Sequence, residues 1–189
     1  MVIKKLINYI INRFYCNETI VLYNLKSHDA YNPIKSVAII KHATIDNLKD
    51  ILYFQPERYI DIFKNFLAQG DKGYFAYIDN KCIHRSWVKT NEQTVYFHWA
   101  YPYKLKRNEV FVHYCETAPQ ARGKNVYPHV LSTIIEEHRN KDVLISINNN
   151  NIPSKKGVEK VGFRERERIK IIVVLGFKII KRIVKDSLG

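Results

Sequence analysis

A strand–helix–strand unit in the second half of the chain constrains the fold most. Val110–Cys115 and Val143–Ile147 are β-rich runs, and between them Tyr127–Arg139 carries apolar residues at helical spacing. The later run is almost wholly apolar, which is typical of a strand buried on both faces. A helix that joins two such strands crosses over one face of their sheet. The pattern therefore predicts a mixed α/β protein with helices packed on a sheet.

Two helices are predicted earlier in the chain, just after a strand that ends at Ile39 and Ile40. Thr44 is expected to cap the first helix, and Pro56 and Gly70 to begin and end the second. The apolar stripes of the two helices are Ile45, Leu48, Ile51 and Leu52, and Ile60, Phe63, Phe66 and Leu67. Two helices thus precede the main run of strands.

Further strands surround the central unit. Tyr74–Ile78 and Cys82–Val88 are short β-rich runs joined by a polar turn, and this pattern predicts a hairpin. Val95–Trp99 adds one more strand. Beyond the central unit, Pro153 begins a short helix and Phe163–Leu175 again has strand character. The predicted order is a mixture of α and β, with antiparallel strands early and a crossover late.

Length and composition exclude several classes of protein. A chain of 189 residues predicts a single domain over residues 1–189, and a hydrophobic content of 46% excludes intrinsic disorder. No apolar run reaches about 18 residues, so no membrane span is predicted. Cys16, Cys82 and Cys115 show neither the spacing of a zinc site nor a disulfide framework. No metal is expected, and a reducing cytoplasm is the expected location.

The charge points to anionic partners. The formal net charge is +13 and the sequence pI is about 9.6, a balance that favours phosphates, nucleic acid or membrane headgroups. Much of the excess lies at the two ends, where residues 1–14 and 176–189 form basic, amphipathic extensions. We expect these extensions to be helices that contact an anionic membrane at its inner face. Packing on the core or on another subunit is the alternative.

Two polar motifs flank the strand that ends at Ile147. The turn before the predicted helix contains Thr117, Pro119, Arg122, Gly123, Lys124, Asn125 and Tyr127. Unpaired amides and the dipole at the start of a helix favour an anion, so this turn is a candidate phosphate site. The second motif reads N-x-x-S-x-x-x-x-E-K-x-G-F from Asn151 to Phe163. Asn151 is expected to cap the helix that follows.

Together the two motifs resemble those of the GNAT superfamily of N-acetyltransferases, whose acetyl-CoA loop reads R-x-x-G-x-G/A after a strand and whose later block ends in G-F. The likeness covers residues 109–175, with both motifs in order and separated by a helix and a strand. It implies an α/β (α+β mixed) fold with a GNAT-type splayed, mostly antiparallel sheet flanked by helices. It also implies direct transfer of an acetyl group from acetyl-CoA to a primary amine.

The resemblance implies a set of cofactor contacts as well. The pyrophosphate of CoA would lie on the amides of Arg122 to Val126. The pantetheine arm would pair with Tyr114–Thr117, where this strand splays from Val143–Ile147, and would meet Asn151. The cofactor-binding residues expected are Cys115, Thr117, Arg122, Gly123, Lys124, Asn125, Val126, Tyr127, Asn151 and Ser154.

Three positions depart from the family pattern. Asn125 stands where the loop has its first glycine, and asparagine tolerates the left-handed backbone that the turn requires. Tyr127 replaces the second small residue and is expected to point away from the cofactor; similar loops occur in relatives from surface-polysaccharide pathways. Val158 stands where many members have a tyrosine that protonates the departing thiolate, so the usual general acid is missing.

Glu116 and His113 are the candidate catalytic bases. Because side chains alternate along a strand, Tyr114 and Glu116 are expected on one face, and His113 and Cys115 on the other. Glu116 is slightly favoured, and the alternatives are a salt-bridged carboxylate and a packed core histidine. The amide of Thr117 or of its neighbours would polarise the thioester carbonyl, as the resemblance implies.

The acceptor is expected to be an amino sugar carried on a nucleotide or lipid phosphate, because the positive charge favours a phosphorylated substrate. Arg85, Trp87 and Tyr114 are the expected substrate contacts, with an ordinary half-buried strand as the alternative for the first two. Other acceptors left open are a polyamine, a small amine and a protein amine. A different class is a non-catalytic module that binds nucleic acid or membrane, although no nucleic-acid motif accompanies the basic segments. A monomer or a homodimer is expected.

Overall fold

The computed structural model describes residues 14–90 and 92–184. Their main feature is an eight-stranded sheet in the order β10-β9-β1-β8-β7-β4-β3-β2. Its strands are β1 (Tyr15–Leu25), β2 (Ile39–His42), β3 (Lys72–Ile78), β4 (Lys81–Lys89), β7 (Glu109–Thr117), β8 (Asp142–Asn148), β9 (Arg164–Val174) and β10 (Phe177–Val184). Within the described sheet, β7 and β8 form the one parallel pair. The predicted mixed α/β class with a mostly antiparallel sheet is confirmed.

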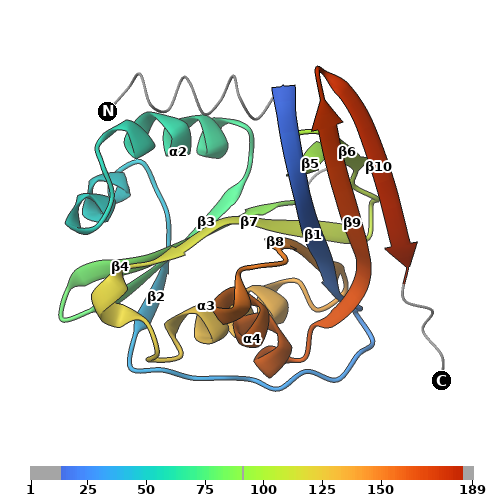
Figure 1. Cartoon of the computed structure of the whole chain (residues 1–189). Coiled ribbons are helices and arrows are strands. Elements are labelled where there is room, and N and C mark those ends of the chain that lie inside the picture. Colours follow the sequence, from blue (N-terminus) through green and yellow to red (C-terminus); the bar gives the residue numbers. More distant parts are fainter. Residues whose placement is uncertain (1–13, 91, 185–189) are drawn as a thin grey trace.

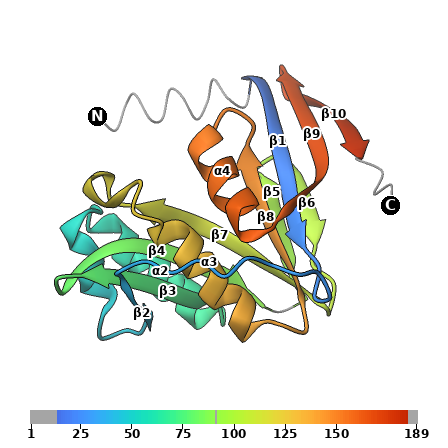
Figure 2. The same cartoon turned by 90° about the horizontal axis from the view of Figure 1, so that it is seen from below.

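Helices cover both faces of this sheet (Figure 1 and Figure 2). The helical elements are η1 (Leu48–Tyr53), α2 (Arg58–Ala68), η2 (Pro119–Ala121), α3 (Val126–Glu137) and α4 (Ile152–Val161). One apolar cluster lies between the sheet and the α3–α4 layer, and another lies beneath η1 and α2. A third cluster joins the sheet to a separate hairpin of β5 (Thr94–His98) and β6 (Tyr101–Lys104).

The early hairpin and the helices predicted after Pro56 and after Pro153 form as predicted. Asp79 and Asn80 link β3 to β4 with φ angles of 50° and 57°, a left-handed pair that suits a tight hairpin turn. Helix α2 ends just before Gly70, which has φ 81°. Pro153 lies in the first turn of α4, as expected, and β9 occupies most of the strand predicted at Phe163–Leu175. These local signals therefore agree with the tertiary fold.

Strand β1 lies in the middle of the sheet although it comes early in the chain. It pairs antiparallel with β8 from Ile20↔Asn148 to Leu25↔Val143, and with β9 along its other edge. The sequence analysis did not predict this strand. In Figure 1 the chain then leaves β1, runs beneath α4 and α3 and enters β2, which lies at the far edge of the sheet. The first and last thirds of the chain are therefore interleaved.

Two predicted helices are corrected. The segment after Thr44 forms only the short 3-10 helix η1, with Asn47 at its N-terminal boundary, and Ile45 and Leu52 remain exposed. The predicted C-terminal amphipathic helix is the strand β10, which pairs with β9. Of the N-terminal segment 1–14, only Phe14 lies within the described residues, so the rest of that prediction is untested.

Candidate functional site

The parallel strands β7 and β8 separate after a short paired stretch. Their last partners are Val112 and Ile145, and beyond this point β8 continues to pair only with β1. The free end of β7, residues 113–117, keeps β4 as its neighbour on one side. Its other edge therefore presents backbone groups to an opening in the middle of the sheet, where the splay was expected.

A bulge in β7 changes which side chains share a face. Trp87 is opposite His113 and Arg85 is opposite Glu116, so β7 has one more residue than β4 across this interval. Tyr114 lies within the bulge and has a left-handed backbone with φ 50°. Strict alternation therefore fails at this position.

The predicted placement of Tyr114 and Glu116 on one face holds, but the pairing of His113 with Cys115 on the other face is wrong for this reason. His113 and Tyr114 both contact the ring of Phe66 on α2, with ring centroids 5.0 Å apart in each case, and Glu116 faces the same side. Cys115 packs instead with the core beneath α3. The bulge thus places His113, the predicted neighbour of Cys115, on the opposite side of the sheet from it.

Arg85 is buried and supports the bulge from β4. Its guanidinium donates hydrogen bonds to the carbonyl oxygen of Tyr114 and, at 2.9 Å, to the Glu116 carboxylate. Gln55 accepts a further bond at 3.2 Å, and the Tyr59 ring centroid is 4.9 Å from the guanidinium carbon. Burial lowers the pKa of Arg85, although Glu116 and neighbouring groups oppose the shift. Arg85, which was predicted to contact the substrate, is thus a buried side chain that holds the β7 bulge in place.

Of the other two predicted substrate contacts, only one reaches solvent. The Trp87 side chain is completely buried and packs against Phe63 and Phe66, with ring centroids 5.0 and 5.3 Å away. Tyr114 is 45% exposed beside the same aromatic cluster. In this structure Trp87 is therefore a core residue, and Tyr114 remains accessible to a ligand.

A cleft of about 680 Å³ opens beside the free end of β7. Its lining residues are His84, Cys115, Glu116, Thr117, Ala121, Arg122, Gly123, Asn125, Val126, Tyr127, Pro128, Asn151, Pro153, Ser154, Lys156, Gly157 and Lys160. Every residue expected to bind the cofactor, except Lys124, is among them. Segments from two motifs separated by a helix and a strand therefore form one surface.

The loop before α3 provides the anion-binding features of this cleft. Gly123 and Asn125 have φ angles of 76° and 56°, so asparagine does adopt the left-handed backbone expected at its position. The first amides of α3 lie at the cleft without an acceptor inside the helix. Arg122 Nε donates to the Thr117 carbonyl at 3.2 Å, which ties the loop to β7. Amides, helix dipole and guanidinium therefore converge on one region.

Helix α4 supplies the opposite wall. Asn151 Oδ1 accepts a hydrogen bond of 3.2 Å from the Ser154 amide, which confirms the predicted cap. Lys156 and Lys160 line the cleft from this helix, and Lys160 Nζ donates to Asn125 Oδ1 at 2.9 Å. The sequence analysis did not assign these lysines to the site, although their four-residue spacing places them on one helix face.

The cleft is positively charged. Among its described lining residues, Arg122, Lys156 and Lys160 are cationic and Glu116 is the single acid. The distribution fits a multiply charged anion at the loop end and leaves one carboxylate near the bulge.

Tyr127 lies in the wall of the cleft, where the family pattern has a small residue. A Cβ placed on Gly157 would be only 2.9 Å from its ring, so the ring fills the space above that glycine. Burial and the neighbouring Cys115 raise the pKa of the phenol. Burial raises the pKa of Cys115 to about 11. The thiol is therefore protonated at neutral pH and poorly suited to nucleophilic attack.

His84 lies at the inner end of the cleft and was not among the predicted catalytic groups. Its Nδ1 is 2.6 Å from Thr117 Oγ1 and its Nε2 is 2.8 Å from Ser86 Oγ. Burial, reinforced by Arg85, lowers the pKa of this imidazole to about 3. The neutral ring therefore fixes the end of β7 through hydrogen bonds.

His113 and Val158 lie away from the lining of the cleft. His113 Nε2 is 3.2 Å from Asp71 Oδ2, and Lys89 Nζ is 2.8 Å from the same oxygen. Burial lowers the pKa of His113, although Asp71 opposes that shift. This geometry corresponds to the core-histidine alternative. Val158 is fully buried in the core, so it presents no polar group to the cleft.

A second cluster of potential ligands lies on the other side of the sheet. Cys16 Sγ, a Glu18 carboxylate oxygen and His98 Nε2 lie within 4.8 Å of one another. His98 Nδ1, however, accepts a hydrogen bond from the Ala100 amide at 3.2 Å. The ring proton therefore resides on Nε2, which lies 4.0 Å from Cys16 Sγ and 3.6 Å from Glu18 Oε2, and a protonated nitrogen does not coordinate a metal.

The fold is that of the GNAT acetyltransferases. A GNAT-family acetyltransferase from Colwellia psychrerythraea is similar, with a TM-score of 0.61 and 14% identity over 90% of this chain. A conserved protein of unknown function from Staphylococcus epidermidis is also similar, with a TM-score of 0.58 and 9% identity over 87% of this chain. This chain spans 57% and 64% of the lengths of those two chains.

A third similar structure is an aminoglycoside 6′-N-acetyltransferase from Acinetobacter haemolyticus. It has a TM-score of 0.51 and 18% identity, and the match covers 67% of this chain and 91% of that one. Likeness at these identities establishes the fold. No protein-family model and no curated protein matches the sequence. Among the described residues, no helix is long and apolar enough to cross a membrane.

Proposed function

We propose that this protein transfers an acetyl group from acetyl-CoA to a primary amine. The observation that carries the proposal is the cleft itself, in which the free edge of β7, the amides before α3 and the start of α4 meet. Its volume of about 680 Å³ is in the range typical of small-molecule sites, roughly 300–1,000 Å³. The GNAT fold supports the choice of acetyl-CoA.

The lining fits CoA in its distribution of charge. The amides at 122–126, together with Arg122, Lys156 and Lys160, would hold its phosphates. The exposed edge of β7 would pair with the amide groups of the pantetheine arm, and Asn151 and Ser154 would flank it. Acetyl-CoA would supply an acyl group that is already activated as a thioester.

Glu116 is the base that the geometry favours. An amine arrives at neutral pH largely as an ammonium ion and must lose a proton before it can attack a carbonyl. Glu116 lines the cleft, and its side chain is 40% exposed while Arg85 fixes one carboxylate oxygen at 2.9 Å. The carboxylate would take the proton directly or through a water molecule. The adjacent β7 amides would polarise the thioester carbonyl.

We further propose that the acceptor is an amino sugar linked to a nucleotide or lipid phosphate. The net charge of +13 favours a phosphorylated acceptor over a polycation such as a polyamine. One protein of this fold is an aminoglycoside acetyltransferase, which modifies an amine on a sugar-containing molecule. Small amines and protein amines are the competing acceptors in a substrate screen.

Calorimetric titration with acetyl-CoA and with CoA tests the cofactor site. The test variant is Arg122→Glu, and Arg107→Glu is its control because Arg107 is exposed and lies outside the cleft. We expect wild type and control to bind both ligands, and Arg122→Glu to bind at least tenfold more weakly. Absence of binding to the wild-type protein would overturn the proposal. Salt-dependent DNA binding in that case would favour the non-catalytic module.

A second experiment addresses the transfer step. Release of CoA thiol is measured with a panel of amino sugars, small amines and peptides. We expect Glu116→Gln to lose turnover at neutral pH, with CoA affinity retained and partial recovery at higher pH, where more amine is already neutral. Equal turnover by wild type and Glu116→Gln at every pH would contradict the assigned role.

A further inference from the structure

The β9–β10 hairpin ends in an exposed apolar tip. Leu175 and Gly176 form the turn, with φ angles of 49° and 86°. Leu175 and Phe177 are 72% and 79% exposed, and Val174 beside them is also exposed. Strand β10 pairs with β9 alone among the described strands, and every residue of β10 is exposed. An apolar turn of this kind is costly in water unless something covers it.

The apolar tip continues onto one face of the sheet. Directly opposite residues in antiparallel strands place their side chains on the same face, so the register defines rows across β1, β9 and β10. The row nearest the tip is Tyr15, Val174 and Phe177; the next is Asn17, Ile172 and Ile179; the third is Thr19, Lys170 and Lys181. None of these nine residues is acidic. Apolar groups thus come first, and lysines lie behind them.

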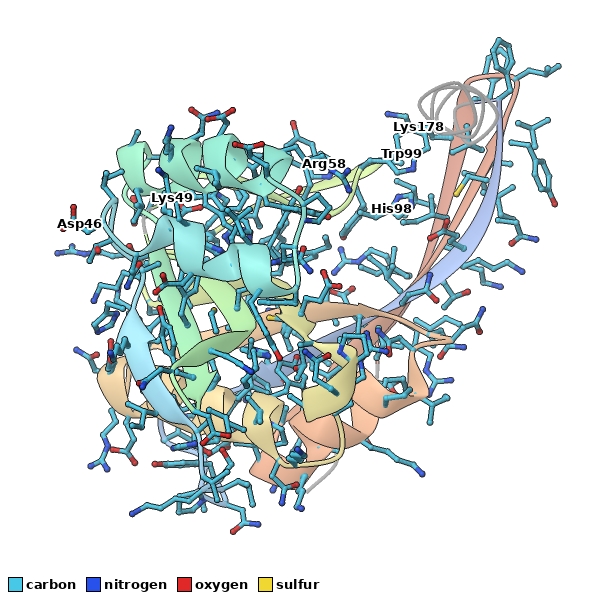
Figure 3. The ribbon with its side chains drawn as sticks, turned by 90° about the vertical axis from the view of Figure 1, so that its left-hand side faces the viewer. Asp46, Lys49, Arg58, His98, Trp99 and Lys178 are labelled. Carbon is cyan, nitrogen blue, oxygen red and sulfur yellow. The ribbon has the colours of Figure 1, made fainter. Side chains whose placement is uncertain are left out.

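The opposite face of the hairpin also combines apolar side chains near the tip with a lysine. Lys178 Nζ lies 5.6 Å from the centroid of the Trp99 ring, and both residues line a hollow of about 450 Å³ with Phe14, Val173 and the turn residues. Figure 3 shows Lys178, Trp99 and His98 in sequence along this side of the molecule. Aromatic rings and lysines next to an apolar tip are the side chains that favour a membrane–water interface.

We propose that the tip of the β9–β10 hairpin docks on an anionic lipid bilayer. The third row is four residues behind the first, which places Lys170 and Lys181 about 13 Å behind Phe177 at a strand rise of about 3.3 Å per residue. The tip can therefore enter the boundary of the acyl chains while the lysines remain among the phosphates of the headgroups. This interaction is independent of the proposed acetyl transfer.

Charge favours a bilayer over a second copy of this chain. Two β10 strands paired edge to edge would bring both copies of Lys178 and of Lys181 into one interface. β10 contains no acidic residue to compensate them. An anionic surface instead gains favourable contacts from the same lysines.

Vesicle sedimentation tests the proposal. Purified protein is mixed with vesicles of phosphatidylcholine alone or with about a third phosphatidylglycerol, at low and at high salt. We expect binding to the anionic vesicles that weakens with salt. The double variant Leu175→Ser, Phe177→Ser should bind at least tenfold more weakly, and Lys170→Glu, Lys181→Glu should lose the preference for anionic lipid.

The matched control is Val37→Ser, Ile39→Ser, which removes two exposed apolar side chains at the other edge of the sheet. It should bind like the wild type. Far-UV circular dichroism and urea midpoints verify that each variant is folded. Absence of wild-type binding to anionic vesicles at low salt, or equal binding by the tip variant, would overturn the proposal. A homodimer that the tip variant abolishes, without vesicle binding, would assign the surface to a second copy.

Discussion

Replacement of Gly157 by alanine tests the packing of the cleft wall. In an ordinary helix interior this change stabilises a protein by about 0.5–1 kcal/mol, because alanine has the higher helix propensity. Here the added Cβ would lie 2.9 Å from Cδ1 and 3.2 Å from Cε1 of Tyr127, and overpacking of this kind costs about 1–3 kcal/mol. We expect Gly157→Ala to lower the free energy of unfolding by about 1 kcal/mol on balance, which corresponds to a fall of about 2–4 °C in Tm for a chain of this size.

A double-mutant cycle isolates the contact. Tyr127→Val removes both ring atoms that the new methyl group would meet, so Gly157→Ala should regain its ordinary stabilising effect in that background. The change of sign corresponds to a coupling free energy of about 1–3 kcal/mol. Urea denaturation of the four proteins measures it. Stabilisation by the same amount in both backgrounds would refute the proposed arrangement of α4 against the Tyr127 ring.

Three further outcomes are expected from the structure. Burial lowers the pKa of His84 to about 3, so as the pH falls below about 6.5 only the unfolded state binds a proton at this side chain. The free energy of unfolding of the wild type should therefore fall by about 1.4 kcal/mol more than that of His84→Gln between pH 7.5 and 5.5, as measured by urea titration. Asp71→Asn should lower the free energy of unfolding by about 3 kcal/mol, because it leaves the Lys89 cation without its buried partner. Asp61→Asn, which removes one partner of an exposed pair, should lower it by less than about 0.5 kcal/mol. Asn151→Ala removes the cap of α4 and should lower the free energy of unfolding by about 1 kcal/mol, and no change would show that the cap does not stabilise the helix.

Local patterns predicted the elements whose signals are local. The left-handed backbone of Asn125, the Asn151 cap and the β3–β4 turn each depend on neighbouring residues, and each has the expected form. The loop before α3 likewise combined with the second motif in one cleft. These features need no knowledge of distant partners.

Features that depend on distant partners were missed. The residues of β10 satisfy a helical pattern, but the turn at Leu175 and Gly176 returns the chain along β9, whose edge supplies the pairing. Similarly, the bulge at Tyr114 is held by Arg85 from another strand, and no pattern within β7 marks it. Tertiary pairing decided the conformation in both cases.

The position of β1 has a consequence for the order of folding. Its two neighbours begin at residues 142 and 164, so β1 is synthesised long before either of them. At a translation rate of about 5–20 residues per second, the interval before its partners emerge is roughly 6–30 s. Throughout that interval both edges of an apolar strand lack their native partners, which is when chaperone binding or intermolecular strand pairing competes with folding. The centre of the sheet is therefore among the last parts of this molecule to assemble.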